Sequence, residues 1–395
     1  MQYTDNDKLI SKIDVWCYRV PIAKRVETSF GAMTSRSAVF VRLEDSDGAF
    51  GWGEIFANWP AAGAEHRVRL LMEDVSDLVL GQVFAQPSDQ IGRLISQTHI
   101  RALQCGEWGS FAHVISGLDI AFNDLLARRA GLPLAQFLNP DAVMSVPTYA
   151  SGIHIRDADR IIDESRALGF DAFKVKVGFD LDTDIEGVKR ICATLGDSER
   201  LFTDANQAWS AAEAIRFLEA LKDHPVGWLE EPLPADAPIA DWSRVATGSN
   251  IPLAGGENIV GDADFANAIG GGIFDVIQPD VAKWGGVSKC REVGLKATVK
   301  GRLYCPHFLG GGIGLAASAA VLASIKGAGL LEVDSNENPL RGAFDLWKQG
   351  EDRSQFHLSD QPGMGITKLP EAITEFESLS ATVTVPGAFT YATRS

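Results

Sequence analysis

The chain has 395 residues, of which 46% are hydrophobic, and its formal net charge is −16 at pH 7. This charge excludes a duplex-binding protein, because such proteins neutralise phosphates with clustered Lys and Arg. No uncharged apolar run reaches the length of about 18 residues that spans a membrane, and the first 15 residues lack an apolar signal segment. We therefore expect a cytoplasmic protein with neither membrane nor nucleic acid as a partner, in which a local cation would have to attract any anionic substrate.

The first part of the chain is predicted to combine strands with helices. Residues 12–22 and 37–55 have the composition of strands, and the second run contains an Asp-Gly turn at 47–48. From 65 to 138 the apolar residues take helical spacing, which ends at Gly131-Leu132-Pro133. Residues 1–143 therefore indicate an α+β domain.

From residue 146 onward, short β-rich runs alternate with longer amphipathic segments. This alternation predicts an α/β fold in which eight strands close into a parallel barrel over residues 144–337. The predicted strands fall at 146–151, 172–177, 200–205, 227–232, 251–257, 274–280, 301–307 and 329–335. Residues 338–395 lack this rhythm and end in a strand-like run, so we expect them to pack back onto the first domain.

Seven of the predicted barrel strands end in an ionisable residue, each about one βα unit after the last. These residues are Lys176, Asp204, Glu230, Glu257, Asp280, His307 and Glu332. The carboxyl ends of all strands in a parallel barrel surround one mouth, so these distant residues are predicted to converge on one site.

Asp204, Glu230 and Glu257 are candidate ligands of a metal ion. All three are hard oxygen donors on consecutive strands, which favours Mg²⁺, with Mn²⁺ possible, over zinc or copper. A cation would also explain how three carboxylates coexist. The alternative is that each acid caps a helix or pairs with a barrel lysine. Glu230 is preferred to Glu231 because alternation along the strand turns one inward and the other outward.

Lys174 and Lys176 are two residues apart on a predicted strand, so both side chains point into the barrel. Next to one another and to a divalent cation, either lysine could have a lowered pKa and serve as a base. The alternatives are that the pair only neutralises barrel acids, or that one lysine forms a Schiff base.

His307 and Asp280 lie at the ends of neighbouring predicted strands. A carboxylate beside an imidazole fixes its tautomer and raises its basicity, which suits a proton carrier. The glycines 310–312 follow at the start of a helix, where free backbone N–H groups would accommodate an anion. A plain flexible turn is the alternative for these glycines.

Taken together, several strings resemble the enolase superfamily, specifically its mandelate racemase subgroup. They are KVK at 174–176, DAN at 204–206, LEEP at 229–232, GGEN at 255–258, PDVAKWGG at 279–286 and GWGE at 51–54, with His307, Glu332 and the helix 116–128. The resemblance implies a (β/α)7β barrel, similar to a TIM barrel, with an α+β capping domain built from the N-terminal region and the C-terminal segment. It also implies a Mg²⁺ ion, removal of the α-proton of a small carboxylate, and an enediolate intermediate.

The resemblance also assigns roles. Lys176 would act as a base on one face of the substrate, and the His307–Asp280 dyad as an acid or base on the other. Lys174 and Glu332 would support the substrate carboxylate, and Asn206 is a further substrate-binding candidate. Specificity would come from two mobile capping loops at about 24–35 and 54–63, which carry the substrate-binding candidates Phe30 and Trp59. A homo-oligomer is expected.

The reaction that follows the enediolate stays open between several outcomes. Loss of a β-hydroxyl would make the protein an acid-sugar dehydratase, which the resemblance favours. Reprotonation on the opposite face would make it a racemase or epimerase, and a sugar-acid lactone would make it a cycloisomerase. A metal-dependent binding protein without catalysis is the alternative from another class.

Overall fold

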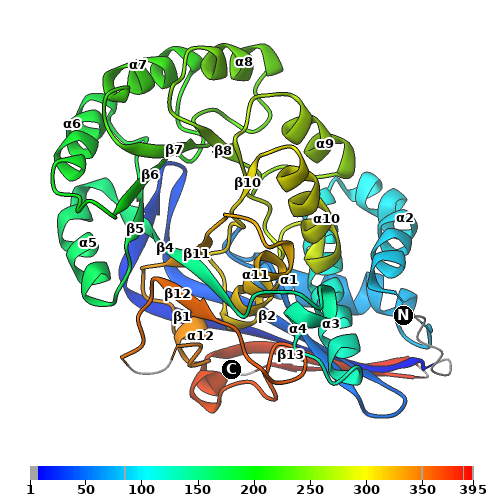
Figure 1. Ribbon diagram of the computed structural model, residues 1–395. Coiled ribbons are helices and arrows are strands. Elements are labelled where there is room, and N and C mark those ends of the chain that lie inside the picture. The colour runs from blue at the N-terminus through cyan, green and yellow to red at the C-terminus, as the bar shows by residue number, and fades with distance from the viewer. Residues whose placement is uncertain (1–7, 84–85, 348–349, 386, 394–395) are drawn as a thin grey trace.

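An antiparallel sheet of five strands forms one side of the molecule, at the bottom of the view in Figure 1. The strands lie in the order β14-β13-β1-β2-β3. Their bounds are β1 (Ile10–Thr28), β2 (Gly31–Asp45), β3 (Phe50–Ile55), β13 (Glu377–Thr384) and β14 (Ala388–Thr393). The expected Asp-Gly turn joins β2 to β3. The last two strands confirm that the C-terminal segment packs back onto the N-terminal domain.

The structure, a computed structural model, describes residues 8–83, 86–347, 350–385 and 387–393. The sequence analysis expected no signal segment in the first 15 residues. Of these, residues 1–7 lie outside the described ranges. Among the helices of the described residues, none has the length and apolar character needed to cross a membrane.

Helices α1 (Gly63–Leu70) and α3 (Trp108–Arg129) pack on the capping sheet. Helix α2 (Pro87–Cys105) packs on α3, and α4 (Leu134–Leu138) packs on α3 and on a barrel helix, α11 (Gly312–Ile325). The long helix α3 lies directly on β3. This approach is possible because Gly51 and Gly53 have no Cβ, and a Cβ on either would collide with the backbone of the helix. The glycines of the GWGE string therefore allow close packing, and this packing fixes where Glu54 emerges at the end of β3.

The second part of the chain forms a curled sheet of parallel strands with helices outside it (Figure 1). Its strands are β4 (Ser145–His154), β5 (Ala172–Lys176), β6 (Arg200–Asp204), β7 (Val226–Glu230), β8 (Leu253–Gly255), β9 (Val276–Ile277), β10 (Leu303–Tyr304) and β11 (Leu331–Asp334). The helices are α5 (Ala158–Ala167), α6 (Leu181–Cys192), α7 (Ala211–Leu221), α8 (Ile239–Thr247), α9 (Asp262–Gly270), α10 (Gly286–Val299) and α11 (Gly312–Ile325). All eight predicted barrel strands are confirmed.

The hydrogen-bonded order of the barrel is β10-β9-β8-β7-β6-β5-β4-β11. Strands β10 and β11, at the two ends of this order, are joined by a hydrogen bond to a side chain and not by a backbone ladder. The backbone N–H of Leu330 donates to Sγ of Cys305 at 3.4 Å. Inside the barrel, the rings of Phe202 and Trp228 stack at 3.5 Å, next to Tyr149. This apolar layer closes the barrel interior below the ends of the strands.

After the barrel the chain forms α12 (Pro339–Gly342) and β12 (Gln355–His357). Strand β12 pairs antiparallel with β4, so part of the C-terminal segment also contacts the barrel. This contact was not expected from the sequence.

The segment expected as a mobile loop at residues 24–35 is instead the end of a long hairpin. Strand β1 continues to Thr28 and strand β2 begins at Gly31, so only Ser29 and Phe30 form the turn. In Figure 1 this blue hairpin extends from the capping sheet toward the ends of β6 and β7. The second predicted loop begins at the end of β3, and α1 starts at its far end.

Candidate active site

The barrel strands bring the first three predicted site residues into adjacent positions. Lys176, Asp204 and Glu230 are the last residues of β5, β6 and β7, and the sheet register pairs Lys176 with Asp204 and Asp204 with Glu230. Glu257, Asp280 and His307 lie in the loops that directly follow β8, β9 and β10. These positions agree with the spacing of ionisable residues in the sequence.

Glu332 lies deeper than expected. Strand β11 continues to Asp334, so Glu332 is its second residue and points into the barrel with no exposed surface. One carboxylate oxygen accepts a hydrogen bond from Ser151 Oγ at 2.5 Å, and the other accepts one from the backbone N–H of Phe308 at 3.0 Å. Glu332 therefore links β4 to the loop that carries His307.

Lys174 connects three carboxylates at the bottom of the site. Its Nζ lies 2.8 Å from Glu230, 2.7 Å from Glu332 and 3.8 Å from Asp204. Burial by itself would lower the pKa of Lys174, but these carboxylates raise it well above its usual value. Among these carboxylates the pKa of Lys174 therefore shifts upward, which favours the protonated lysine because its neighbours are anions.

Lys176 is held by the loop that follows β6. Its Nζ donates to Asn206 Oδ1 at 2.6 Å and to Asp204 Oδ2 at 3.2 Å, and Asn206 Nδ2 donates to both oxygens of Asp204 at 3.0 Å. Asn206 has a φ of 43°, in the left-handed region that is uncommon for residues other than glycine. This conformation lets one amide side chain contact both the candidate base and a candidate metal ligand.

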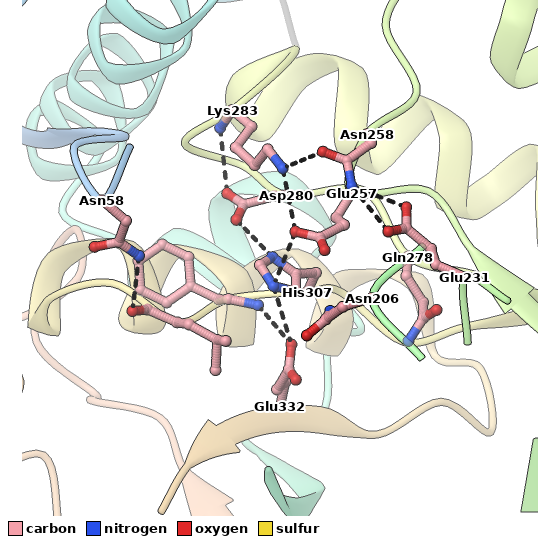
Figure 2. A network of polar contacts seen from close by, with 12 residues as sticks. Asn58, Asn206, Glu231, Glu257, Asn258, Gln278, Asp280, Lys283, His307 and Glu332 are labelled. Carbon is pink, nitrogen blue, oxygen red and sulfur yellow. Dashed lines mark hydrogen bonds and ion pairs between the residues drawn. The ribbon is translucent and has the colours of Figure 1, made fainter. Parts of the chain in front are cut away.

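His307 forms the predicted dyad with Asp280 (Figure 2). Its Nδ1 lies 2.8 Å from Asp280 Oδ2, and its Nε2 lies 3.1 Å from Glu257 and 3.9 Å from Glu332. Burial lowers the pKa of His307, but Glu257, Glu332 and Asp280 outweigh it and raise the pKa to about 10. These carboxylates therefore favour the protonated imidazole. Asp280 fixes Nδ1, and Nε2 points toward Glu257 and Glu332.

Four further residues join this network, and the sequence analysis gave none of them a role. Figure 2 shows Lys283 next to Glu257 and Asn258, with Asn258 also bonded to Glu231. Gln278 donates to Glu230 at 2.6 Å. Glu231, Asn258 and Lys283 lie inside strings that had already been singled out, LEEP, GGEN and PDVAKWGG, and Gln278 lies in the predicted strand 274–280. Proximity to the predicted ligands was the signal that could have identified them.

Strand alternation was expected to turn the side chain of Glu231 outward, but this side chain is buried. Its φ of 37° ends the strand, and its side chain is only 3% exposed because both oxygens accept hydrogen bonds from Asn258. Burial and the neighbouring Glu257 raise the pKa of Glu231 well above its usual value.

The three candidate metal ligands are bonded to basic and amide groups. Among the described residues, no three His, Cys, Asp or Glu side chains already surround a shared ion position. Asp204 contacts Lys176, Glu230 contacts Lys174, and Glu257 contacts Lys283 and His307, so the lysine pairing considered as an alternative is present.

This pairing does not offset all of the negative charge. Burial raises the pKa of Glu230 to about 7, and Asp204 and Glu332 contribute to the increase. In addition, the buried Oε1 of Gln278 has no hydrogen-bond partner. A buried all-oxygen donor set with excess negative charge fits a hard divalent cation such as Mg²⁺.

The glycine turn after His307 does not offer free amides to a ligand. The carboxyl group of Glu54, from the capping domain, occupies the place expected for a ligand. Its oxygens accept hydrogen bonds from the backbone N–H groups of Gly311 at 2.5 Å and Gly314 at 2.8 Å. A Cβ on Gly310 would lie 2.7 Å from the same carboxylate. The glycines thus accommodate an internal carboxyl group, and the expected ligand site is wrong because Glu54 already fills it.

The capping hairpin reaches the site at Asn206. Ser29 Oγ donates to the backbone oxygen of Asn206 at 2.7 Å. Next to Ser29, the exposed ring of Phe30 packs edge-on against Trp59 at 5.6 Å, so the two predicted specificity segments contact one another. Asn58, beside Trp59, donates to the backbone oxygen of Leu309 at 3.4 Å.

Family models match most of the chain. Residues 11–139 match the model of the mandelate racemase / muconate lactonizing enzyme N-terminal domain, and residues 157–372 match the enolase C-terminal domain-like model. A solved structure described as a mandelate racemase/muconate lactonizing enzyme from Bordetella bronchiseptica is 40% identical, with a TM-score of 0.86, and covers 93% of this chain and 99% of its own. A racemase from Streptomyces coelicolor with bound magnesium is 28% identical, with a TM-score of 0.82, over 93% and 100%.

Characterised relatives include lyases and isomerases. D-galactarolactone cycloisomerase of Agrobacterium fabrum is 29% identical over 89% of this chain and 95% of its own. The 3,6-anhydro-alpha-L-galactonate cycloisomerase of Streptomyces coelicolor is 33% identical over 76% and 82%. L-talarate/galactarate dehydratase of Salmonella typhimurium is 30% identical over 70% and 69%.

A capped parallel barrel with lysines, a histidine–aspartate dyad and clustered carboxylates at one mouth defines an enzyme, of the lyase or isomerase type. The chain belongs to the mandelate racemase and muconate lactonizing enzyme family of the enolase superfamily.

Proposed function

We propose that this enzyme uses Mg²⁺ to remove the α-proton of a small carboxylate substrate, and that its reaction is the dehydration of an acid sugar. The observation that carries the proposal is the placement of Lys176 and His307. Strand β5 carries Lys176 and His307 follows β10; four strands lie between β5 and β10 on one side of the barrel and two, β4 and β11, on the other. Two proton-transfer groups on opposite sides of one mouth suit an elimination, which needs a base and an acid.

Asp204, Glu230 and Glu257 would hold the Mg²⁺ ion, and Mn²⁺ would suit the same oxygens. When bound, the ion would act as a Lewis acid toward the carboxylate of the substrate and stabilise the negative charge that develops there. The protonated Lys174, with Glu332 beside it, would support the same carboxylate.

In the proposed reaction, Lys176 takes the proton from the α-carbon, which leaves an enediolate. Asn206 holds the Nζ of Lys176 in place during this step. His307 then donates its Nε2 proton to the β-hydroxyl as the bond from the β-carbon to that oxygen breaks, and water leaves. The resulting enol becomes a 2-keto acid. Phe30 and Trp59 would contact the distal part of the substrate.

Cycloisomerisation is a second candidate because two of the relatives are named for it. In a lactone or anhydro sugar, the oxygen on the β-carbon belongs to a ring. The same base and acid would then open the ring instead of releasing water.

The test is a library of mono- and diacid sugars, their lactones and their anhydro forms, incubated with the protein and Mg²⁺ in heavy water. A 2-keto product from a linear acid identifies a dehydratase, and consumption of a lactone or anhydro form without water loss identifies a cycloisomerase. Deuterium at the α-carbon without either product identifies a racemase or epimerase. No exchange with any member of the library would contradict the proposal and leave a binding protein.

A further inference from the structure

Lys283 and Glu231 lie on either side of the candidate ligand Glu257 without being candidate ligands themselves. Lys283 Nζ lies 3.1 Å from Glu257 Oε2 and donates to Asn258 Oδ1 at 2.7 Å. Asn258 Nδ2 in turn donates to the two oxygens of Glu231 at 3.0 and 2.9 Å. One amide side chain thus separates the partly buried ammonium group of Lys283 from the buried carboxyl group of Glu231, as Figure 2 shows.

The position of Lys283 is fixed by the capping domain as well as by the barrel. Its Nζ lies 5.3 Å from the centre of the Phe56 ring, which follows β3, and its side chain is 16% exposed. An ammonium group over an aromatic face is stabilised where it stands. Lys283 therefore keeps its charge at Glu257 whether or not an ion is present.

A divalent ion held by Glu257 would be repelled by the ammonium of Lys283, whose Nζ lies 3.1 Å from the same carboxylate.

We propose that Lys283 is a positioning residue that lowers the affinity of the site for Mg²⁺, an inference that rests on the function proposed above. Lys283 competes with the ion for Glu257 and weakens binding. Groups behind the direct ligands commonly change metal affinity by about tenfold or more.

The experiment is isothermal titration of the metal-free protein with MgCl₂ at pH 8.5, without substrate. Lys283→Met removes the charge but keeps the length of the side chain, and it should bind Mg²⁺ about fivefold more tightly than wild type. Lys283→Arg keeps the charge and should stay within about twofold of wild type.

A matched control is Lys289→Met, since Lys289 pairs with the exposed residues Asp262 and Glu292 on the same side of the barrel. It should leave the affinity unchanged. Circular dichroism and thermal unfolding establish that each variant is folded. Tighter binding in Lys283→Met with wild-type binding in Lys283→Arg supports the inference, because a purely structural role would weaken binding in Lys283→Met.

Weaker or unchanged binding in Lys283→Met would overturn the inference while the proposed function stands. If the wild-type protein itself does not bind Mg²⁺, the proposed function fails, and the inference fails with it.

Discussion

Ser29 of the capping hairpin donates a hydrogen bond to the backbone oxygen of Asn206, and this contact joins the cap to the candidate base. Asn206 accepts from Lys176 at 2.6 Å, so a movement of the hairpin turn is transmitted to Lys176 through one residue. Asn206 has a left-handed backbone conformation, which costs energy, so the loop after β6 keeps this conformation only through its contacts with other residues.

Ser29→Ala should therefore lower kcat/KM about fivefold, the effect of losing one hydrogen bond of about 1 kcal/mol. Steady-state kinetics on the best substrate from the acid-sugar library measures it. Thr34→Ala, at an exposed position of the same hairpin, is the control and should leave kcat/KM unchanged. Equal rates for Ser29→Ala and wild type would show that the hairpin contact does not reach the base.

Lys176→Ala and His307→Asn should each reduce turnover by at least about 100-fold while the protein stays folded, because each removes a proton-transfer group. Product formation and circular dichroism are the two measurements. Lys189→Ala, which removes a partly exposed lysine of α6 that pairs with Glu186 at the surface, serves as the control. Wild-type rates in Lys176→Ala or His307→Asn would refute the assigned roles.

The free energy of unfolding should depend on pH through Glu54. Burial raises the pKa of Glu54 to about 7 from a usual value of 4.5. Its contribution to stability is therefore fully present below about pH 4.5 and is lost as the pH rises through 7, since the unfolded chain releases this proton first. Glu54→Gln cannot titrate, so between pH 5 and pH 8 the stability of wild type relative to this variant should fall by about 1–3 kcal/mol.

Urea unfolding of both proteins at the two pH values measures this difference. The same relative stability at pH 5 and pH 8 would show that Glu54 titrates as an ordinary carboxyl group.

Asp334→Asn should destabilise the fold by about 3–5 kcal/mol, because it removes the charge that two arginines share. Arg36 Nη2 lies 2.6 Å from Asp334 Oδ2, with both side chains 1% exposed, and Arg341 Nη1 lies 3.4 Å from the same oxygen. Chemical denaturation at pH 7 measures the loss. Asp163→Asn, at an exposed ion pair with Arg166, should change stability by less than about 1 kcal/mol. A similar small change at Asp334 would contradict the expectation.

The barrel could be predicted from the sequence because its strands and helices repeat at a regular interval. That interval placed Lys176, Asp204 and Glu230 at the ends of adjacent strands, where the structure has them. The capping hairpin was harder to predict. Pro21 interrupts the strand pattern, and the β1–β2 register shifts between Pro21 and Val26, so the continuation to Thr28 has no regular alternation.

The contacts between distant segments could not be predicted from the sequence. Glu54 and Gly311 are 257 positions apart, and no local pattern indicates that one fills the amide site formed by the other. Lys283 follows the predicted strand end, in a turn without periodicity, so its approach to Glu257 depends on how two loops fold together. Local spacing therefore located the mouth of the barrel, and tertiary packing determined the partners of its charges.

The pairing of β13 with β1 affects the order in which this protein can be completed on the ribosome. Residues 12–18 of β1 find their partners only at residues 377–384, after every barrel strand has been synthesised. Until then, the capping sheet has an open edge on one of its longest strands, and such edges invite pairing with other chains. Nascent chains should therefore be most prone to aggregation late in translation, when the barrel can already fold and the cap still lacks its closing strand.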